Sequence, residues 1–196
     1  LFFIDKVSNY LDYSEEGSEV EGQFAKWFDE LFIEERAKSD MYKDLLPQDP
    51  HELRRAYFSV MKKGGKSKAI DSSERGNSND NDAYDLIMRD KERLLSGDEP
   101  VRFIFSHSAL REGWDNPNVF QICVLREMGA TLERRQTIGR GLRLPVNADG
   151  ERVKESSIAQ LTVISNESYR EFADSLQREY KAAGVSIGFV RKEEFS

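Results

Sequence analysis

The chain has 196 residues, of which 38% are hydrophobic and 33% are charged, a composition typical of a globular protein with one domain and a sizeable core. Its formal net charge of −7 argues against a free-standing nucleic-acid-binding protein, although a lobe that shares its nucleic-acid groove with a second lobe needs only local positive charge. The single cysteine, Cys123, excludes an internal disulfide, and no apolar run approaches the ~20 residues that span a membrane, so we expect a cytoplasmic protein.

The first part of the chain predicts a strand, a loop and an amphipathic helix. Residues 1–4 begin abruptly as an apolar strand, so we expect the chain to be one domain of a longer polypeptide. Residues 9–22 are rich in Asp and Glu and predict a polar loop. Residues 23–37 predict a helix with one apolar face, which is far more typical of a core contact than of a cofactor site. The apolar side chains at helical spacing are Phe24, Trp27, Phe28, Leu31 and Phe32.

The next part of the chain is more polar. Residues 41–50 predict a loop, and they are followed by a short helix over residues 51–57 and a strand over residues 56–60. Residues 62–82 have no apolar periodicity and predict a mobile loop, whose lysines contact either solvent or nucleic-acid phosphate. The chain has no glycine-rich GxxxxGK(S/T) loop, so we expect no triphosphate cradle of its own.

The remainder alternates between helices and strands. Residues 101–105, 119–125 and 158–164 are β-branched or aromatic runs bounded by turn residues, as buried strands of a parallel sheet are. Residues 82–96 and 167–183 predict helices. Their expected core contacts are Leu86, Ile87, Met88, Leu94 and Leu95 in the first, and Tyr169, Phe172, Leu176 and Tyr180 in the second. The alternation predicts an α/β fold with a mainly parallel sheet and helices on both faces.

Two arginines in the second half of the chain carry the strongest chemical signal. Arg140 and Arg143 lie three positions apart on a predicted helix, with Gln136 one turn back on the same face. Two guanidinium forks that point together suit a phosphate. Gly139 and Gly141 each weaken a helix by roughly 0.5–1 kcal/mol relative to alanine, so close approach of a ligand or partner domain explains them better. Spacing alone leaves a second interpretation open, in which this is a solvated arginine-rich face.

Two ordered motifs carry a family resemblance. The pattern Gln136…Gly139-Arg140…Arg143 resembles motif six (QxxGRxxR) of superfamily-two helicases, and residues 112–117, EGWDNP, resemble their motif five. More closely, FIFSHSALREGWDNPNVFQIC and RRQTIGRGLRL resemble the restriction (Res) subunit of type III restriction-modification enzymes, which are ATP-dependent DNA motors and nucleases. The resemblance runs in pieces over residues 1–188.

The resemblance implies a fold and an ATP site. Residues 1–196 are expected to form a single helicase C-terminal domain, the second RecA-like lobe, without a Walker A motif. ATP and Mg²⁺ are expected to be held mainly by a first lobe elsewhere in the longer chain, which leaves this lobe inactive alone. Arg140 and Arg143 are implied to be arginine fingers on the γ-phosphate, with Gln136 positioning phosphate or water. The implied nucleotide contacts are Gly113, Gly139 and Asp115, the last through the ribose.

The resemblance also implies a DNA contact and protein partners. Lys6, Ser106 and His107 are expected to touch DNA, although a solvated lysine and a structural histidine are alternatives for Lys6 and His107. Expected partners are double-stranded DNA, the first RecA-like lobe and nuclease domain of the same chain, and the modification (methyltransferase) subunit. No metal-ligand cluster or membrane contact is predicted. Two other functions stay open: a lobe of another superfamily-two DNA translocase, and a non-catalytic interaction domain of the same fold.

Overall fold

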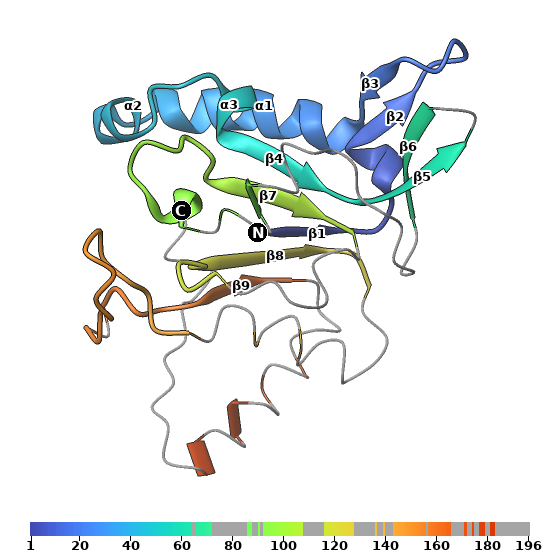
Figure 1. The fold of residues 1–196 in the computed structure, drawn as a ribbon. Helices are drawn as coiled ribbons and strands as arrows, with labels where there is room; N and C mark the ends of the chain where they lie inside the picture. Colours follow the sequence, from blue (N-terminus) through green and yellow to red (C-terminus); the bar gives the residue numbers. More distant parts are fainter. Residues whose placement is uncertain are drawn as a thin grey trace.

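Five strands lie side by side in one sheet, with a long helix packed on it (Figure 1). The structure is a computed structural model. It describes residues 1–63, 66–71, 86–87, 90, 92–107, 116–127, 136, 139, 143–155, 157–165, 171, 174, 177–178 and 181–182, with the backbone alone at residues 62, 63, 66 and 67.

The sheet is parallel throughout, with strand order β4-β7-β1-β8-β9. Its strands are β1 (Phe2–Ile4), β4 (Arg54–Tyr57), β7 (Phe103–Ser106), β8 (Gln121–Leu125) and β9 (Thr162–Ile164). The central strand β1 places Phe2 opposite Phe105 on one side and Cys123 on the other. This sheet and its helices confirm the predicted α/β, RecA-like fold class, and four of its strands lie within or overlap the predicted runs at residues 1–4, 101–105, 119–125 and 158–164.

Helix α1 (Gln23–Ala37) has the predicted bounds and packs on one face of the sheet through a row of phenylalanines. The ring of Phe28 lies 4.9 Å from that of Phe103 and 5.6 Å from that of Phe105, measured between centroids, both edge to face. The predicted stripe was too wide, because Trp27 and Leu31 are 47% and 56% exposed. Phe24, Phe28 and Phe32 are spaced by four and form the row that packs on the sheet. Trp27 and Leu31 each come one position earlier than Phe28 and Phe32, so they lie to the side of that row.

The other face of the sheet carries two apolar clusters. Ile104 and Tyr57 contact the buried Leu86 and Ile87, as predicted for the latter two, and β1 and β8 add a second apolar cluster. Within the predicted 82–96 helix, Arg93–Leu95 form a 3-10 helix, η3, while Asp82 and Met88 lie outside the described residues. The described residues between 171 and 182 are helical, as predicted. Tyr169, Phe172, Leu176 and Tyr180, whose apolar contacts were predicted, lie outside the described residues.

Three predicted loops turn out to contain regular structure. Residues 9–22 form a hairpin of β2 (Leu11–Tyr13) and β3 (Glu19–Glu21) after a 3-10 turn, η1 (Val7–Asn9). Residues 41–50 contain most of α2 (Asp40–Leu45) and the start of α3 (Pro50–Leu53), so the predicted 51–57 helix is shorter and β4 begins earlier. Most acidic residues of these stretches are exposed, Asp49 is the N-cap of α3, and Pro50 lies in the first turn of α3, where its missing N–H costs no helical hydrogen bond.

The third predicted loop begins as a second hairpin. Strands β5 (Ser59–Lys63) and β6 (Lys66–Ile70) pair antiparallel, so the predicted 62–82 loop starts with strand residues. Residues 72–82 lie outside the described part, and their mobility stays a prediction. No helix among the described residues is long and apolar enough to cross a membrane.

A buried arginine joins α1, the first hairpin and the sheet. Arg54, which opens β4, is 6% exposed, and its Nε and Nη2 atoms donate to the two carboxylate oxygens of Asp29 at 2.7 Å each. Nη1 donates to the hydroxyl of Tyr10 at 2.7 Å, and Nη2 also donates to Glu21. Burial opposes the charge of Arg54, but these hydrogen bonds outweigh it and raise its pKa. We call these four residues the Arg54 charge centre.

Replacing the arginine tests how much this charge centre stabilises the fold. In Arg54→Met, Asp29 keeps its charge but loses its bidentate partner, so we expect the free energy of unfolding to fall by about 3–5 kcal/mol. The control Arg55→Met removes a half-buried guanidinium that donates to the backbone carbonyls of His51 and Arg54, and it should cost about 1 kcal/mol or less. Urea unfolding followed by circular dichroism measures both variants. Equal losses in the free energy of unfolding would show that the charge centre stabilises the fold no more than an ordinary half-buried arginine does.

Candidate functional site

The carboxyl ends of the strands lie along one edge of the sheet, at the right of Figure 1. Because Phe3 pairs with Ser106 and Ile4 pairs with Leu125, the residues that follow three adjacent strands reach this edge together. Lys6 comes after β1, His107 after β7, and Arg126 after β8. Such an edge is where open α/β sheets bind ligands.

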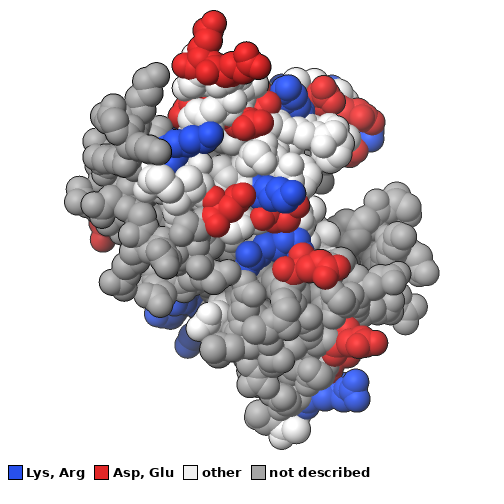
Figure 2. Space-filling view, turned by 90° about the vertical axis from the view of Figure 1, so that its right-hand side faces the viewer, with Lys and Arg blue, Asp and Glu red and all other residues white. Residues whose placement is uncertain are grey.

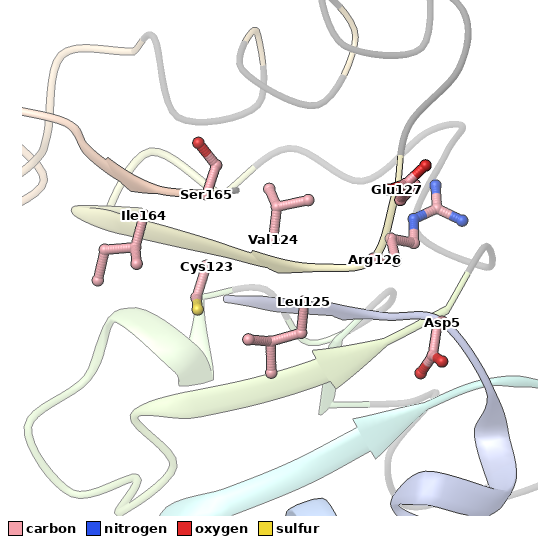
Figure 3. Close-up of a pocket in the computed structure, with 8 residues that line it drawn as sticks. All are labelled: Asp5, Cys123, Val124, Leu125, Arg126, Glu127, Ile164 and Ser165. Carbon is pink, nitrogen blue, oxygen red and sulfur yellow. The ribbon is translucent and has the colours of Figure 1, made fainter. Parts of the chain in front are cut away.

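A pocket of about 730 Å³ opens beside the ends of β1, β8 and β9. In Figure 3, Asp5, Arg126 and Glu127 gather at the end where β1 and β8 finish, whereas Cys123 lies further back along β8, opposite Ile164 at the end of β9. Burial raises the pKa of the Cys123 thiol, so this cysteine stays protonated and lines the pocket as an apolar group. The pocket therefore has a charged end and an apolar end.

The three residues predicted to touch DNA all lie at this edge, in different environments. Lys6 is exposed, and its backbone N–H donates to Asp5 Oδ1 at 2.8 Å, which fixes the turn after β1. His107 is half-buried. Ser106 is fully buried, and its hydroxyl donates to the backbone carbonyl of Tyr57 at 3.1 Å, so it joins β7 to β4. A contact between the Ser106 hydroxyl and DNA stays a prediction that would require this hydrogen bond to open.

The residues predicted to act on ATP are described in part. Gln136 and Gly139 are helical and exposed, and Arg143 is exposed just beyond them. A Cβ added at Gly139 meets no atom within 4 Å, so no close contact inside the described part explains this glycine. Gly113, Asp115 and Arg140 lie outside the described residues. The common face predicted for Arg140 and Arg143 therefore stays a prediction.

Sequence reasoning missed a side-chain contact between the two motif segments. Asn118, which follows the motif-five stretch, binds the backbone of Val146, which follows Arg143. The Nδ2 of Asn118 donates to the Val146 carbonyl at 3.1 Å, and the Val146 N–H donates to Asn118 Oδ1 at 2.8 Å. The residue pattern Asn-Pro-Asn signals a turn, but nothing in it signals a partner so distant in the chain.

Charges of both signs share the face onto which the strands point. Figure 2 views the molecule from that side, and in its described part Lys and Arg side chains alternate with Asp and Glu, without an unbroken basic stripe. This agrees with the acidic balance of the whole chain. Any phosphate contact in the described part of this face depends on individual side chains such as Lys6, because that part is not uniformly basic.

Possible metal ligands among the described residues gather away from this edge. Glu21, Asp29 and His51 offer ligand atoms within 4.8 Å of one another. The guanidinium of Arg54 lies among them, within 3.2 Å of His51 Nδ1 as well as bound to both carboxylates. A cation, the Arg54 guanidinium, already lies among these ligand atoms, so Glu21 and Asp29 serve the Arg54 charge centre and His51 lies beside it.

Removing the buried hydroxyl of Ser106 measures how much its hydrogen bond stabilises the fold. Ser106→Ala loses the hydrogen bond to Tyr57, so we expect unfolding to become easier by about 1 kcal/mol. Ser165→Ala removes an exposed hydroxyl after β9 and should change stability by less than about 0.5 kcal/mol. Thermal melts of both variants make the comparison, and an unchanged melt for Ser106→Ala would contradict a structural role for this hydroxyl.

Three proteins of known function are similar to the chain. The Res subunit of the type III restriction-modification enzyme EcoPI from Escherichia phage P1 is 39% identical over 161 residues, and that of EcoP15I from Escherichia coli is 40% identical over 161 residues. The Res subunit of StyLTI from Salmonella typhimurium is 32% identical over 191 residues. The matches cover 79% of the chain for the first two relatives and 90% for the third. The chain spans 15% to 19% of the length of these relatives, and no protein-family model matches it.

Proposed function

Since the chain belongs to the family of Res subunits of type III restriction-modification enzymes, we propose that it is the second motor lobe of such an enzyme. The lobe works within a longer polypeptide that hydrolyses ATP, moves on double-stranded DNA and cuts it. The observation that carries this proposal is the exposed segment of Gln136, Gly139 and Arg143, whose glycine faces open space.

The exposed segment is suited to reach another lobe. Gly139 has an ordinary helical backbone and no neighbour that excludes a side chain, so an alanine would fit and would favour the helix in this lobe alone. A glycine is useful there if a nucleotide or a second lobe approaches the backbone closely. Arg140 and Arg143 then act as arginine fingers on the γ-phosphate, Gln136 positions the phosphate or water, and Gly113 and Asp115 contact the nucleotide, the latter at its ribose.

ATP and Mg²⁺ are held mainly by the first lobe. The chain has no GxxxxGK(S/T) loop. In the described part, the one group of carboxylates and histidine close enough to hold a metal ion, Glu21, Asp29 and His51, already surrounds Arg54. Arginine fingers stabilise charge that develops on a phosphate which other groups hold in place. The division between the lobes follows, with binding on one and transition-state stabilisation on the other.

The DNA track passes the carboxyl edge of the sheet. Lys6 and His107 follow the neighbouring strands β1 and β7 there, so a phosphate can lie between them. Because the face carries charges of both signs, DNA is held by few contacts from this lobe and by the opposing lobe. The modification subunit, which methylates DNA, and a nuclease domain of the same polypeptide complete the enzyme in the cytoplasm.

The arginine fingers are tested in the full-length enzyme. Arg143→Ala should lower kcat for ATP by ~10³ or more and change KM little, because a finger acts on the transition state more than on bound ATP. Arg152→Ala removes an exposed arginine from the turn that follows Arg143 and should leave kcat within about twofold. Steady-state ATPase assays with DNA and a thermal melt for each variant give the comparison.

Two results would count against the fingers. Wild-type turnover in a folded Arg143→Ala enzyme would contradict the assignment of Arg143 and favour a solvated arginine. Equal losses in Arg143→Ala and Arg152→Ala would show that any lost positive charge in this region slows the enzyme.

The purified chain tests the division between lobes. Residues 1–196 alone should hydrolyse no ATP with or without DNA, because fingers accelerate a reaction only when the phosphates are held by another lobe. Phosphate release measured with and without double-stranded DNA is the readout. DNA-stimulated hydrolysis by this chain would mean that it carries a complete ATP site, contrary to the proposal.

A further inference from the structure

The side-chain amide of Asn118 bonds to both the backbone N–H and the backbone C=O of one residue, Val146. Its oxygen accepts from the N–H of Val146 and its nitrogen donates to the C=O of the same residue, at 2.8 and 3.1 Å. Asn118 and Val146 are both half-buried, so water competes weakly for these bonds. A two-point contact fixes orientation as well as distance, and it replaces the strand partner that Val146 lacks on that side. We call it the Asn118 clamp.

One end of the clamp is held firmly by its own segment. Asn116 is 7% exposed, and its Oδ1 accepts the backbone N–H of Asn118 at 2.8 Å. Beyond Pro117 and Asn118 the chain enters β8, which is hydrogen bonded on both sides within the sheet. The sheet therefore determines where the Asn118 side chain stands.

The other end of the clamp lies in a turn that is well ordered within itself. The N–H of Val153 donates to Pro145 O at 2.8 Å and that of Asn147 donates to Glu151 O at 2.9 Å, so Val146 and Arg152 form an antiparallel bridge. Asn147 Oδ1 accepts two further backbone N–H groups, from Asp149 and Glu151. These bonds keep the shape of the turn, and the Asn118 clamp fastens it to the segment that leads into the sheet.

The clamp lies close to Arg143 along the chain. Leu144 and Pro145 alone separate Arg143 from Val146, and Pro145 is buried. The proline ring fixes its own φ and Pro145 is buried, so this short connection has restricted freedom. A movement of Val146 therefore also displaces the nearby backbone of Arg143.

We propose that Asn118 is a positioning residue for ATP hydrolysis: its clamp on Val146 sets the place from which Arg143 reaches the phosphate. This inference rests on the proposed function, in which Arg143 is an arginine finger. Asn118 itself touches neither nucleotide nor DNA. It joins the segment between motif five and β8 to the turn just after motif six, so the position of β8 fixes both.

Loss of the clamp should affect turnover rather than ATP binding. The motif-five side keeps its support from Asn116 and β8, whereas the turn beyond Arg143 loses its attachment. A finger displaced by about 1 Å can cost ~10²-fold in rate. We therefore expect Asn118→Ala in the full-length enzyme to lower kcat by ~10- to 100-fold, with KM for ATP within about threefold.

The experiment compares four variants of the full-length enzyme by DNA-dependent ATPase kinetics and thermal melts. They are Asn118→Ala, Arg143→Ala, the double variant and the control Asn147→Ala. Asn147 also caps backbone N–H groups of this turn, but among the described residues its side chain does not bond to the segment from Asn116 to Asn118, so its loss should leave kcat within about twofold. If Asn118 acts through Arg143, the double variant is no slower than Arg143→Ala, because there is no finger left to misplace.

Each other outcome counts against the inference. Normal kcat in a folded Asn118→Ala enzyme overturns it, as do losses that multiply in the double variant or an equal loss in Asn147→Ala. Should Asn118→Ala not fold, Asn118→Asp keeps the acceptor for the Val146 N–H and is judged by the same criteria. A normal kcat in Arg143→Ala instead contradicts the proposed function, whereas a slow Arg143→Ala with a normal Asn118→Ala contradicts the positioning role alone.

Discussion

Strand β1 pairs in parallel with β7 on one side and with β8 on the other, and this pairing determines where the other parts of the fold lie. Because all five strands run in one direction, the chain must leave each of them at the same edge of the sheet. Residues far apart in sequence, such as Lys6, His107 and Arg126, are brought together by this constraint alone. A site built this way needs no local sequence cluster.

Two different interactions hold the helical layer against that sheet. The ring of Phe28 packs edge to face on phenylalanines of β1 and β7. Such apolar contacts hold the helix on the sheet but do not by themselves fix its position along the strands. Arg54 adds direction, because its guanidinium bonds to Asp29 of α1, Glu21 of β3 and Tyr10 at fixed angles. The phenylalanines therefore stabilise the packing of α1 on the sheet, and the charge centre fixes where α1 and the first hairpin lie relative to β4.

The sequence predicted what local patterns determine. The apolar runs of β1, β7 and β8 and the helical spacing of α1 are local, and the structure has these elements where they were expected. The hairpin at residues 9–22 was missed because its exposed positions are acidic and outweigh the short alternation of apolar residues. Arg54 and Asn118 were missed as structural residues, since their partners lie far away in the chain and only the fold brings them together. The order of motifs was enough to name the candidate site, whereas the buried position of Ser106 required the sheet.

In the function that we propose, this lobe contributes an arginine to an ATP held by another lobe. A structure of the full-length enzyme with DNA, ADP, Mg²⁺ and aluminium fluoride in place of the transferred phosphate tests it most directly. We expect the guanidinium of Arg143 to lie at hydrogen-bond distance, about 2.7–3.2 Å, from the fluoride or β-phosphate oxygens. An Arg143 side chain that points to solvent in that complex, with the phosphate mimic surrounded entirely by residues of the other lobe, would contradict it.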